Sequence, residues 1–258
     1  MPFIDSGRCR INLEVDGPEG GAPLILSHFL GGRIETFDWQ MPVLSGRRVI
    51  RFDTRGHGAS DAPDGDYSVA MLGRDVLAIM DALNIARADF LGVSQGGMTG
   101  MWLASEHPER INRLVLANTT TFIPNKPVWD ELAARAVAEG MGAIARATIT
   151  GWLSDGFRAA EPATVEALIG HMSAMPVAGY VGNTRVLRDV DLRDALGRIA
   201  APTLVVGGQE DGPRGAAIPL IAQGVQDGRS LILAGAAHLA HIENGPEFNA
   251  AIARHLDL

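Results

Sequence analysis

A serine between glycines is the first sign of chemistry in this chain. Residues 92–97 read Gly-Val-Ser-Gln-Gly-Gly and stand between an apolar run, 88–93, and a helical pattern. A serine on such a sharp strand-to-helix turn takes a strained backbone conformation, and the residues two before and two after it must be very small. The turn presents the hydroxyl at a helix N-terminus, which favours the anion of an acyl-transfer intermediate. This pattern predicts that Ser94 is a nucleophile.

The acid that such a serine requires is expected later in the chain. A serine hydroxyl needs a base, and the base needs a carboxylate to orient it. Where the serine occupies this kind of turn, the acid and then the histidine follow it in sequence. Asp211 stands after the apolar run 203–206, with Glu210 as the neighbouring alternative, whereas the loop after the preceding run, 118–120, offers no carboxylate. We expect Asp211 to be the acid.

The expected base follows the last apolar run. His238 comes soon after residues 230–233 and before the final helical pattern, while His241, three residues on, could be helical or packed beneath it. Two histidines at this spacing could share a metal ion, but the local spacing implies no further ligand. We therefore expect His238 to be the catalytic base and expect no metal site.

The loop at 28–32, His-Phe-Leu-Gly-Gly, follows the apolar run 24–27. In this architecture it lies beside the nucleophile turn and supplies one backbone N–H to an oxyanion hole, the second coming from the residue after the serine. Backbone donors do not depend on the side chain. We assign the two donors to Leu30, with Phe29 as the alternative, and to Gln95, and we expect no catalytic role for the His28 imidazole.

Residues 53–60, Asp-Thr-Arg-Gly-His-Gly-Ala-Ser, look catalytic by composition. Their glycines and their position after an apolar run fit a structural turn better, with a buried arginine satisfied by hydrogen bonds. We expect this segment to support the fold and not to react.

Short apolar runs alternate with amphipathic segments along most of the chain. This alternation is typical of an α/β protein with a mostly parallel central sheet flanked by helices. Ser68 can cap one helix and Pro108 can end another. The expected strands are residues 24–27, 48–52, 88–93, 113–117, 203–206 and 230–233.

Residues 122–197 interrupt this alternation with helical segments only. An all-helical insertion at the strand ends of such a sheet is expected to be a lid over the ligand site. The sequence therefore predicts a core of residues 1–121 and 198–258 and a helical lid of 122–197. Candidate pocket residues are Trp129, Trp152 and Arg135 of the lid and Phe29 of the core.

Composition narrows the possible partners. The chain has 258 residues, a formal charge of −8 and one cysteine, Cys9, which fits a half-buried strand position in the alternating run 8–15. This charge argues against nucleic-acid binding, which needs clustered basic residues. No stretch approaches eighteen apolar residues, and residues 1–10 lack the apolar run of a secretory signal. We expect a cytoplasmic protein without membrane or nucleic-acid partners, either a monomer or a homodimer.

Together these segments resemble the α/β-hydrolase fold over essentially the whole chain. The resemblance implies that Ser94, Asp211 and His238 form a catalytic triad and that no cofactor is needed. Within that fold the chain is similar to the 3-oxoadipate enol-lactonases of aromatic-acid degradation. The residues that match those enzymes are 53–58, 128–129, 139–141, Trp152 and 242–243.

Three features depart from the enol-lactonase pattern, one being the pair His28-Phe29, where that family has a smaller polar pair. That family often carries an arginine one turn after the lid tryptophan, where this chain has Leu132, and an apolar residue after the nucleophile, where it has Gln95. The lid carries seven basic and nine acidic side chains, so its charge does not steer anions inward. An acidic substrate would need one local arginine, for which Arg135, Arg158 and Arg185 are the candidates.

The expected function is hydrolysis of a small carboxylic ester or lactone through an acyl-enzyme, as in an enol-lactonase. The same triad could instead serve another carboxylesterase, a carbon–carbon bond hydrolase or a perhydrolase. A different class of function is a ligand receptor built on this fold, in which slow hydrolysis accompanies partner binding.

Overall fold

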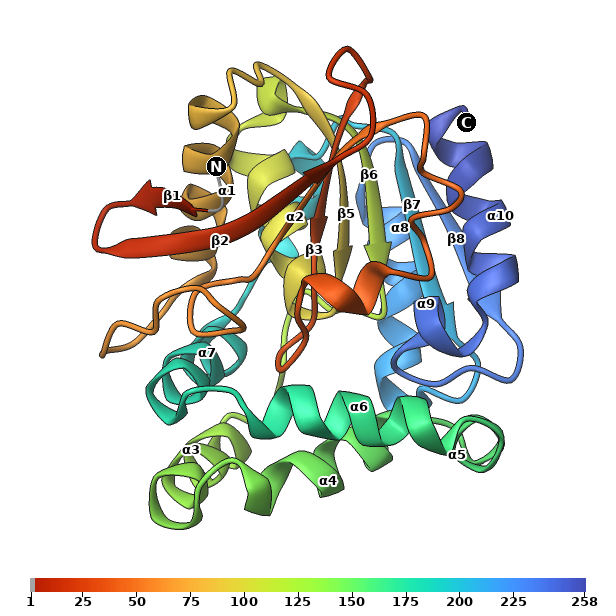
Figure 1. The fold of residues 1–258 in the computed structure, drawn as a ribbon. Coiled ribbons are helices and arrows are strands. Elements are labelled where there is room, and N and C mark those ends of the chain that lie inside the picture. The colour runs from red at the N-terminus through yellow and green to blue at the C-terminus, as the bar shows by residue number, and fades with distance from the viewer. Residues whose placement is uncertain (1–2) are drawn as a thin grey trace.

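An eight-stranded sheet forms the centre of the molecule in the computed structural model, which describes residues 3–258 (Figure 1). The strand order is β1-β2-β4-β3-β5-β6-β7-β8. The β1–β2 and β2–β4 pairs are antiparallel and all other pairs are parallel. The strands are β1 Phe3–Ser6, β2 Cys9–Asp16, β3 Pro23–Ser27, β4 Arg48–Phe52, β5 Ala88–Val93, β6 Ile111–Ala117, β7 Thr203–Gly208 and β8 Gly228–Leu233.

The expected α/β fold is confirmed, and all six expected strands are present with ends shifted by at most two residues. Strands covered on both faces read as continuous apolar runs, and every residue of β5 and of β7 is buried. The antiparallel strand β1 was not expected. Cys9 begins β2 and is 2% exposed, so it is buried and not half-buried. Residues 1 and 2 of the expected core lie outside the described residues.

Helices flank the sheet and cover one of its ends. Ser68 caps α1 by accepting a hydrogen bond from the backbone N–H of Met71, and α2 ends two residues before Pro108. The α-helices are α1 Val69–Ala82, α2 Gln95–Glu106, α3 Pro127–Glu139, α4 Gly142–Trp152, α5 Asp155–Ala160, α6 Pro162–Ser173, α7 Val177–Asp189, α8 Ala217–Gly224, α9 Ala240–Glu243 and α10 Gly245–Leu256; the 3₁₀ helices are η1 Ile34–Phe37, η2 Pro108–Arg110, η3 Arg193–Arg198 and η4 Gly212–Ala216.

Helices α3 to α7 gather beyond the carboxyl ends of the parallel strands, away from the rest of the helices (Figure 1). This helical cluster leaves the core after β6 and returns before β7. An isolated antiparallel bridge joins Phe122 to Asp191, and Leu192 N donates to Thr121 O at 2.8 Å, so the two ends of the insertion lie side by side. The next element, η3, packs against α2. The position of this cluster supports the lid that we propose for these residues.

In the part of the chain from residue 3 onward, no helix is both long enough and apolar enough to cross a bilayer. The same residues include no cluster of three or more histidine, cysteine or acidic side chains suited to hold a metal ion.

Candidate active site

Ser94 sits on the tight turn between β5 and α2, with φ of 53° and ψ of −110°. A side chain with a Cβ rarely adopts this conformation, and the neighbouring glycines make it possible. A Cβ added at Gly92 would lie 2.2 Å from Gly96 O, and one added at Gly96 would lie 2.1 Å from Ser27 O. The backbone of Ser94 is held on both sides, because its N–H donates to Ala117 O at 2.8 Å and its carbonyl accepts from the Thr119 hydroxyl at 2.7 Å.

A methyl group at Gly92 is therefore expected to destabilise the fold. Gly92→Ala cannot be accommodated without moving the nucleophile turn, so we expect the free energy of unfolding to fall by about 3 kcal/mol or more. Gly170→Ala is the matched control, because its added Cβ meets no atom within 4 Å and alanine favours the helix by about 0.5–1 kcal/mol. Urea unfolding of both variants checks this; equal midpoints would contradict the packing argument.

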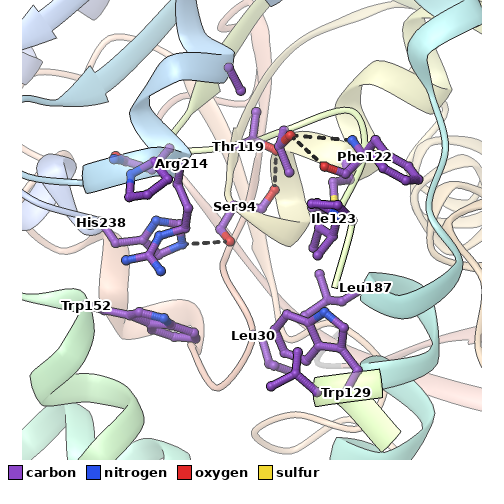
Figure 2. Close-up of a pocket in the computed structure, with 17 residues that line it drawn as sticks. Leu30, Ser94, Thr119, Phe122, Ile123, Trp129, Trp152, Leu187, Arg214 and His238 are labelled. Atoms are coloured by element: carbon purple, nitrogen blue, oxygen red, sulfur yellow. Dashed lines mark hydrogen bonds between the residues drawn. The ribbon is translucent and has the colours of Figure 1, made fainter. Parts of the chain in front are cut away.

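The structure brings Ser94, His238 and Asp211 together (Figure 2). Ser94 Oγ lies 3.1 Å from His238 Nε2, and His238 Nδ1 lies 2.9 and 3.1 Å from the two Asp211 oxygens. A carboxylate accepts only, so Nδ1 carries the proton and Nε2 accepts from the serine hydroxyl. Glu210, the alternative acid, is exposed. This is the arrangement in which a histidine can take a proton from a serine.

The Asp211 carboxylate accepts hydrogen bonds from two donors besides His238. These are Asn118 Nδ2 at 3.0 Å and Arg214 Nε at 2.7 Å. Burial raises the pKa of Asp211, but the hydrogen bonds from His238, Arg214 and Asn118 outweigh burial and hold that pKa below its usual value. Asp211 is therefore ionised at neutral pH. The roles of Arg214 and Asn118 were not predicted, since neither residue belongs to the motif that identified the acid.

The 28–32 loop is fixed to the core by two buried histidines. His28 Nε2 accepts from Thr54 N at 3.0 Å, and His57 Nε2 accepts from Gly31 N at 2.9 Å. Burial lowers the pKa of His28, and burial with the nearby His28 lowers that of His57 well below its usual value. Both imidazoles are thus neutral, as acceptors at Nε2 must be. They position the loop, a role that sequence alone did not assign.

Leu30 and Gln95 stand where the oxyanion donors were expected. Leu30 lines the cavity at Ser94, and Gln95 is the first residue of α2. Between residues 3 and 258, the backbone N–H groups of Leu30, of the alternative Phe29 and of Gln95 donate to no protein acceptor, whereas Gly31 N and Gly32 N do. Two free N–H groups flanking a nucleophile are what an oxyanion hole requires.

The cavity in front of Ser94 has a volume of about 340 Å³ (Figure 2). Its walls are mainly apolar and come from both the core and the helical cluster, with Trp129 and Trp152 on the cluster side. The Trp152 ring lies 5.3 Å from the His238 ring, measured between centroids. Leu30, Met98, Phe122 and Ile123 also line the cavity, together with Ser94 and His238.

Comparison with known proteins agrees with this geometry. Residues 22–139 match the family model described as alpha/beta hydrolase fold. The chain is 34% identical over 252 residues to 3-oxoadipate enol-lactonase 2 of Acinetobacter baylyi, covering 94% of this chain and 91% of the relative. The chain belongs to the α/β-hydrolase fold family. The recognised similarity to enol-lactonases is confirmed as well.

Solved α/β hydrolases match over the full length. The enol-lactonase from Burkholderia xenovorans LB400 superposes with a TM-score of 0.95 at 33% identity, covering 100% of both chains. A hydrolase from Pseudomonas aeruginosa PA01 also gives a TM-score of 0.95, at 37% identity, covering 99% of this chain and 98% of that one.

Two of the expected pocket residues of this α/β hydrolase lie elsewhere. Phe29 is fully buried behind Trp152, with ring centroids 6.1 Å apart, and does not line the cavity. Arg135 is half exposed and pairs with Glu139 at 3.0 Å. Arg135 follows Trp129 by six residues, which in a helix corresponds to a rotation of about 120°. The arginine therefore projects from a different side of the helix than the tryptophan. The expectation that Phe29 and Arg135 line the pocket is corrected.

The other lid arginines are also absent from the cavity of this α/β hydrolase. Arg158 pairs with Asp155 on the surface, and Arg185 pairs with Asp130 and Asp66. The departures from the enol-lactonase pattern at positions 132 and 95 do not enter the cavity either. Leu132 packs on the core, and Gln95 donates to Asn183 on α7 at 2.8 Å.

The helical cluster of this α/β hydrolase is tied directly to the histidine loop. His238 N donates to Trp152 O at 2.8 Å. Glu243 accepts from Ser154 N at 2.7 Å with one oxygen and from Ala237 N at 3.0 Å with the other. The end of α4 and the backbone that carries the candidate base are therefore one hydrogen-bonded unit.

His241 is packed beneath this unit and does not touch the cavity. It lies in α9, is fully buried, and its ring stands among those of Phe29, Phe37 and Phe248. Within the described chain neither ring nitrogen has a hydrogen-bond partner. Burial, with a smaller contribution from His238, lowers the pKa of His241 to about 3.

Acid is therefore expected to destabilise the protein through its buried histidines. The folded state keeps His241 neutral, whereas the unfolded chain binds a proton near pH 6.5, so unfolding gains protons below that pH. We expect the free energy of unfolding to fall by about 1.4 kcal/mol per pH unit for each such histidine between pH 6.5 and the folded-state pKa. His241→Leu should lower the pH dependence of the free energy of unfolding by the equivalent of about one proton, measured by urea titrations at pH 7, 6 and 5. Parallel curves for the variant and the wild type would contradict this.

Proposed function

We propose that the protein is a serine hydrolase that cleaves a small carboxylic ester or lactone through an acyl-enzyme. The observation that carries the proposal is the hydrogen-bonded series Ser94–His238–Asp211 at the end of an apolar cavity. The similarity to enol-lactonases supports a lactone as the substrate. The cavity volume, about 340 Å³, fits a small molecule.

The first half of the proposed reaction forms the acyl-enzyme. His238 Nε2 takes the hydroxyl proton as Ser94 Oγ attacks the carbonyl carbon, and ionised Asp211 stabilises the imidazolium. The N–H groups of Leu30 and Gln95 hold the negative oxygen of the tetrahedral intermediate. His238 then returns the proton to the leaving oxygen. In a lactone that oxygen belongs to the same molecule, so the ring opens and the whole substrate stays bound to Ser94.

The second half releases the acid. A water molecule takes the place of the leaving group, His238 removes its proton, and the resulting hydroxide attacks the ester carbonyl. The second tetrahedral intermediate uses the same two N–H donors, and its collapse frees Ser94 with the proton returned from His238.

A substrate panel tests this function. We expect multiple turnover and the highest kcat/KM for lactones when 3-oxoadipate enol-lactone, simple lactones and p-nitrophenyl acetate are compared. A receptor that hydrolyses its ligand would stop after about one equivalent. Mass spectrometry of enzyme quenched during turnover should find the acyl group on Ser94; its attachment elsewhere would overturn the mechanism.

A further inference from the structure

Among residues 3–258, which the structure describes, one cationic side chain lines the cavity. It is Arg214 of η4, which was not among the arginines expected from the sequence. Its side chain is 49% exposed, and the exposed residues Pro124 and Pro213 also line the cavity, so Arg214 stands at the mouth. Figure 2 shows it on the same side of the cavity as His238, with Trp129 and Leu187 on the opposite side. No carboxylate is among the lining residues.

The guanidinium of Arg214 uses only its Nε–H in a hydrogen bond to the described protein. Its Nε donates to Asp211 at 2.7 Å, which fixes the base of the guanidinium plane, and the two terminal nitrogens have no protein partner within the described chain. An arginine held in this way presents a rigid fork of N–H groups that matches a planar carboxylate. Asp211 does not accept from these terminal nitrogens, because its second oxygen already accepts hydrogen bonds from His238 and Asn118.

We propose that Arg214 recognises a free carboxylate on the substrate, an assignment that rests on the proposed hydrolase function. The substrate class is then a lactone or ester that carries a second, unesterified carboxyl group. Its ester carbonyl lies at Ser94 in the apolar part of the cavity, and its carboxylate lies at the mouth against the terminal nitrogens of Arg214. A lactone formed from a dicarboxylic acid has this composition, since ring closure uses one carboxyl group and leaves the other free.

The proposal also explains how an acidic protein would take an acidic substrate. The chain carries a formal charge of −8, and the arginines of the helical cluster are paired on the surface. Long-range attraction therefore contributes little, and recognition depends on one charge at short range. Because this charge comes from the acid loop, the absence of an arginine at position 132 leaves carboxylate binding intact.

A purely positioning role for Arg214 makes a different prediction. If Arg214 only orients Asp211, its replacement slows every substrate equally, mainly in kcat. If it binds the carboxylate, the loss is selective for anionic substrates and falls mainly on KM. A matched substrate pair separates the two roles.

The experiment compares mono-p-nitrophenyl adipate, which is anionic, with methyl p-nitrophenyl adipate, which is neutral. Initial rates of p-nitrophenol release give kcat/KM for each with the wild type, Arg214→Gln and the control Arg135→Gln. We expect Arg214→Gln to lower the anionic-to-neutral ratio of kcat/KM by about tenfold to a hundredfold, the size of a charge-assisted pair on a half-exposed arginine. Arg135→Gln should leave the ratio unchanged, because its side chain is on the outer surface.

An unchanged ratio in Arg214→Gln would overturn the proposal, whether or not both rates fall. Failure of the hydrolase function looks different: the wild type would release p-nitrophenol from neither ester, or a Ser94→Ala variant would release it from both as fast as the wild type. Calorimetry of adipate binding to Ser94→Ala, with and without Arg214→Gln, gives a readout independent of turnover. The double variant should bind adipate about tenfold more weakly.

Discussion

Ser94→Ala is expected to lower kcat for esters and lactones by about 10⁴-fold or more while leaving the fold intact. The hydroxyl makes the bond to the acyl group, and no nearby group can replace it at 3.1 Å from His238. The oxyanion donors and the cavity survive the change, so a small residual rate above background remains. The backbone of Ser94 stays anchored through Ala117 and Thr119, because both hydrogen bonds use main-chain atoms of residue 94.

Two measurements accompany the Ser94→Ala rate. Thermal unfolding should change little, and Ser230→Ala, an exposed serine on β8, should keep wild-type kcat/KM. If Ser94→Ala keeps its esterase activity with an unchanged unfolding curve, the assignment of the nucleophile fails.

Asp211→Asn is expected to cost about 10³- to 10⁴-fold in kcat/KM. The amide has the same shape but no charge, so it neither stabilises the imidazolium nor requires the proton at Nδ1. Its own N–H can donate to Nδ1, which moves the imidazole proton to Nε2 and removes the acceptor that Ser94 needs. Because the wild-type pKa of Asp211 lies below its usual value, the wild type retains its ionised acid at mildly acidic pH. The acid limb of the wild-type rate profile should therefore not come from Asp211.

Glu210→Gln is the matched control for the acid. Glu210 precedes Asp211 directly and is exposed, so losing its charge should change kcat/KM less than threefold or so, the scale of an exposed charge. A loss at Glu210 as large as that at Asp211 would contradict the assignment, and so would full activity of Asp211→Asn. Stopped assays between pH 6 and pH 9 compare all three proteins.

The proximity of Ser94, Asp211 and His238 could be predicted from the sequence because each residue stands in a recognisable local pattern. Small residues around Ser94 are required because Ser94 alone separates β5 from α2, and Asp211 follows the buried strand β7. His238 follows β8, a mostly exposed edge strand that still ends in an easily recognised apolar run, 231–233. Parallel strands bring their carboxyl ends to one edge, so order in the chain becomes proximity in space.

The remainder of the site depends on contacts that no local pattern encodes. Trp129 and Arg135 are both on α3, yet they project from different sides of the helix, so Trp129 lines the cavity and Arg135 does not. Arg214 was not predicted because its place in the site depends on its pairing with Asp211 and on a cavity formed by segments far apart in the sequence. His28 and His57 likewise act across 26 residues, by accepting hydrogen bonds from the backbone of each other's loops.

The bond from His238 N to Trp152 O has an evolutionary consequence. It uses the main chain of residue 152, so the hydrogen bond survives an exchange of the side chain there, even though the Trp152 ring lies beside the imidazole. Adding or deleting a residue between α4 and α5 would shift that carbonyl and displace the base from Ser94. We therefore expect proteins built on this scaffold to tolerate point substitutions at the α4 terminus more readily than changes of chain length at the same junction.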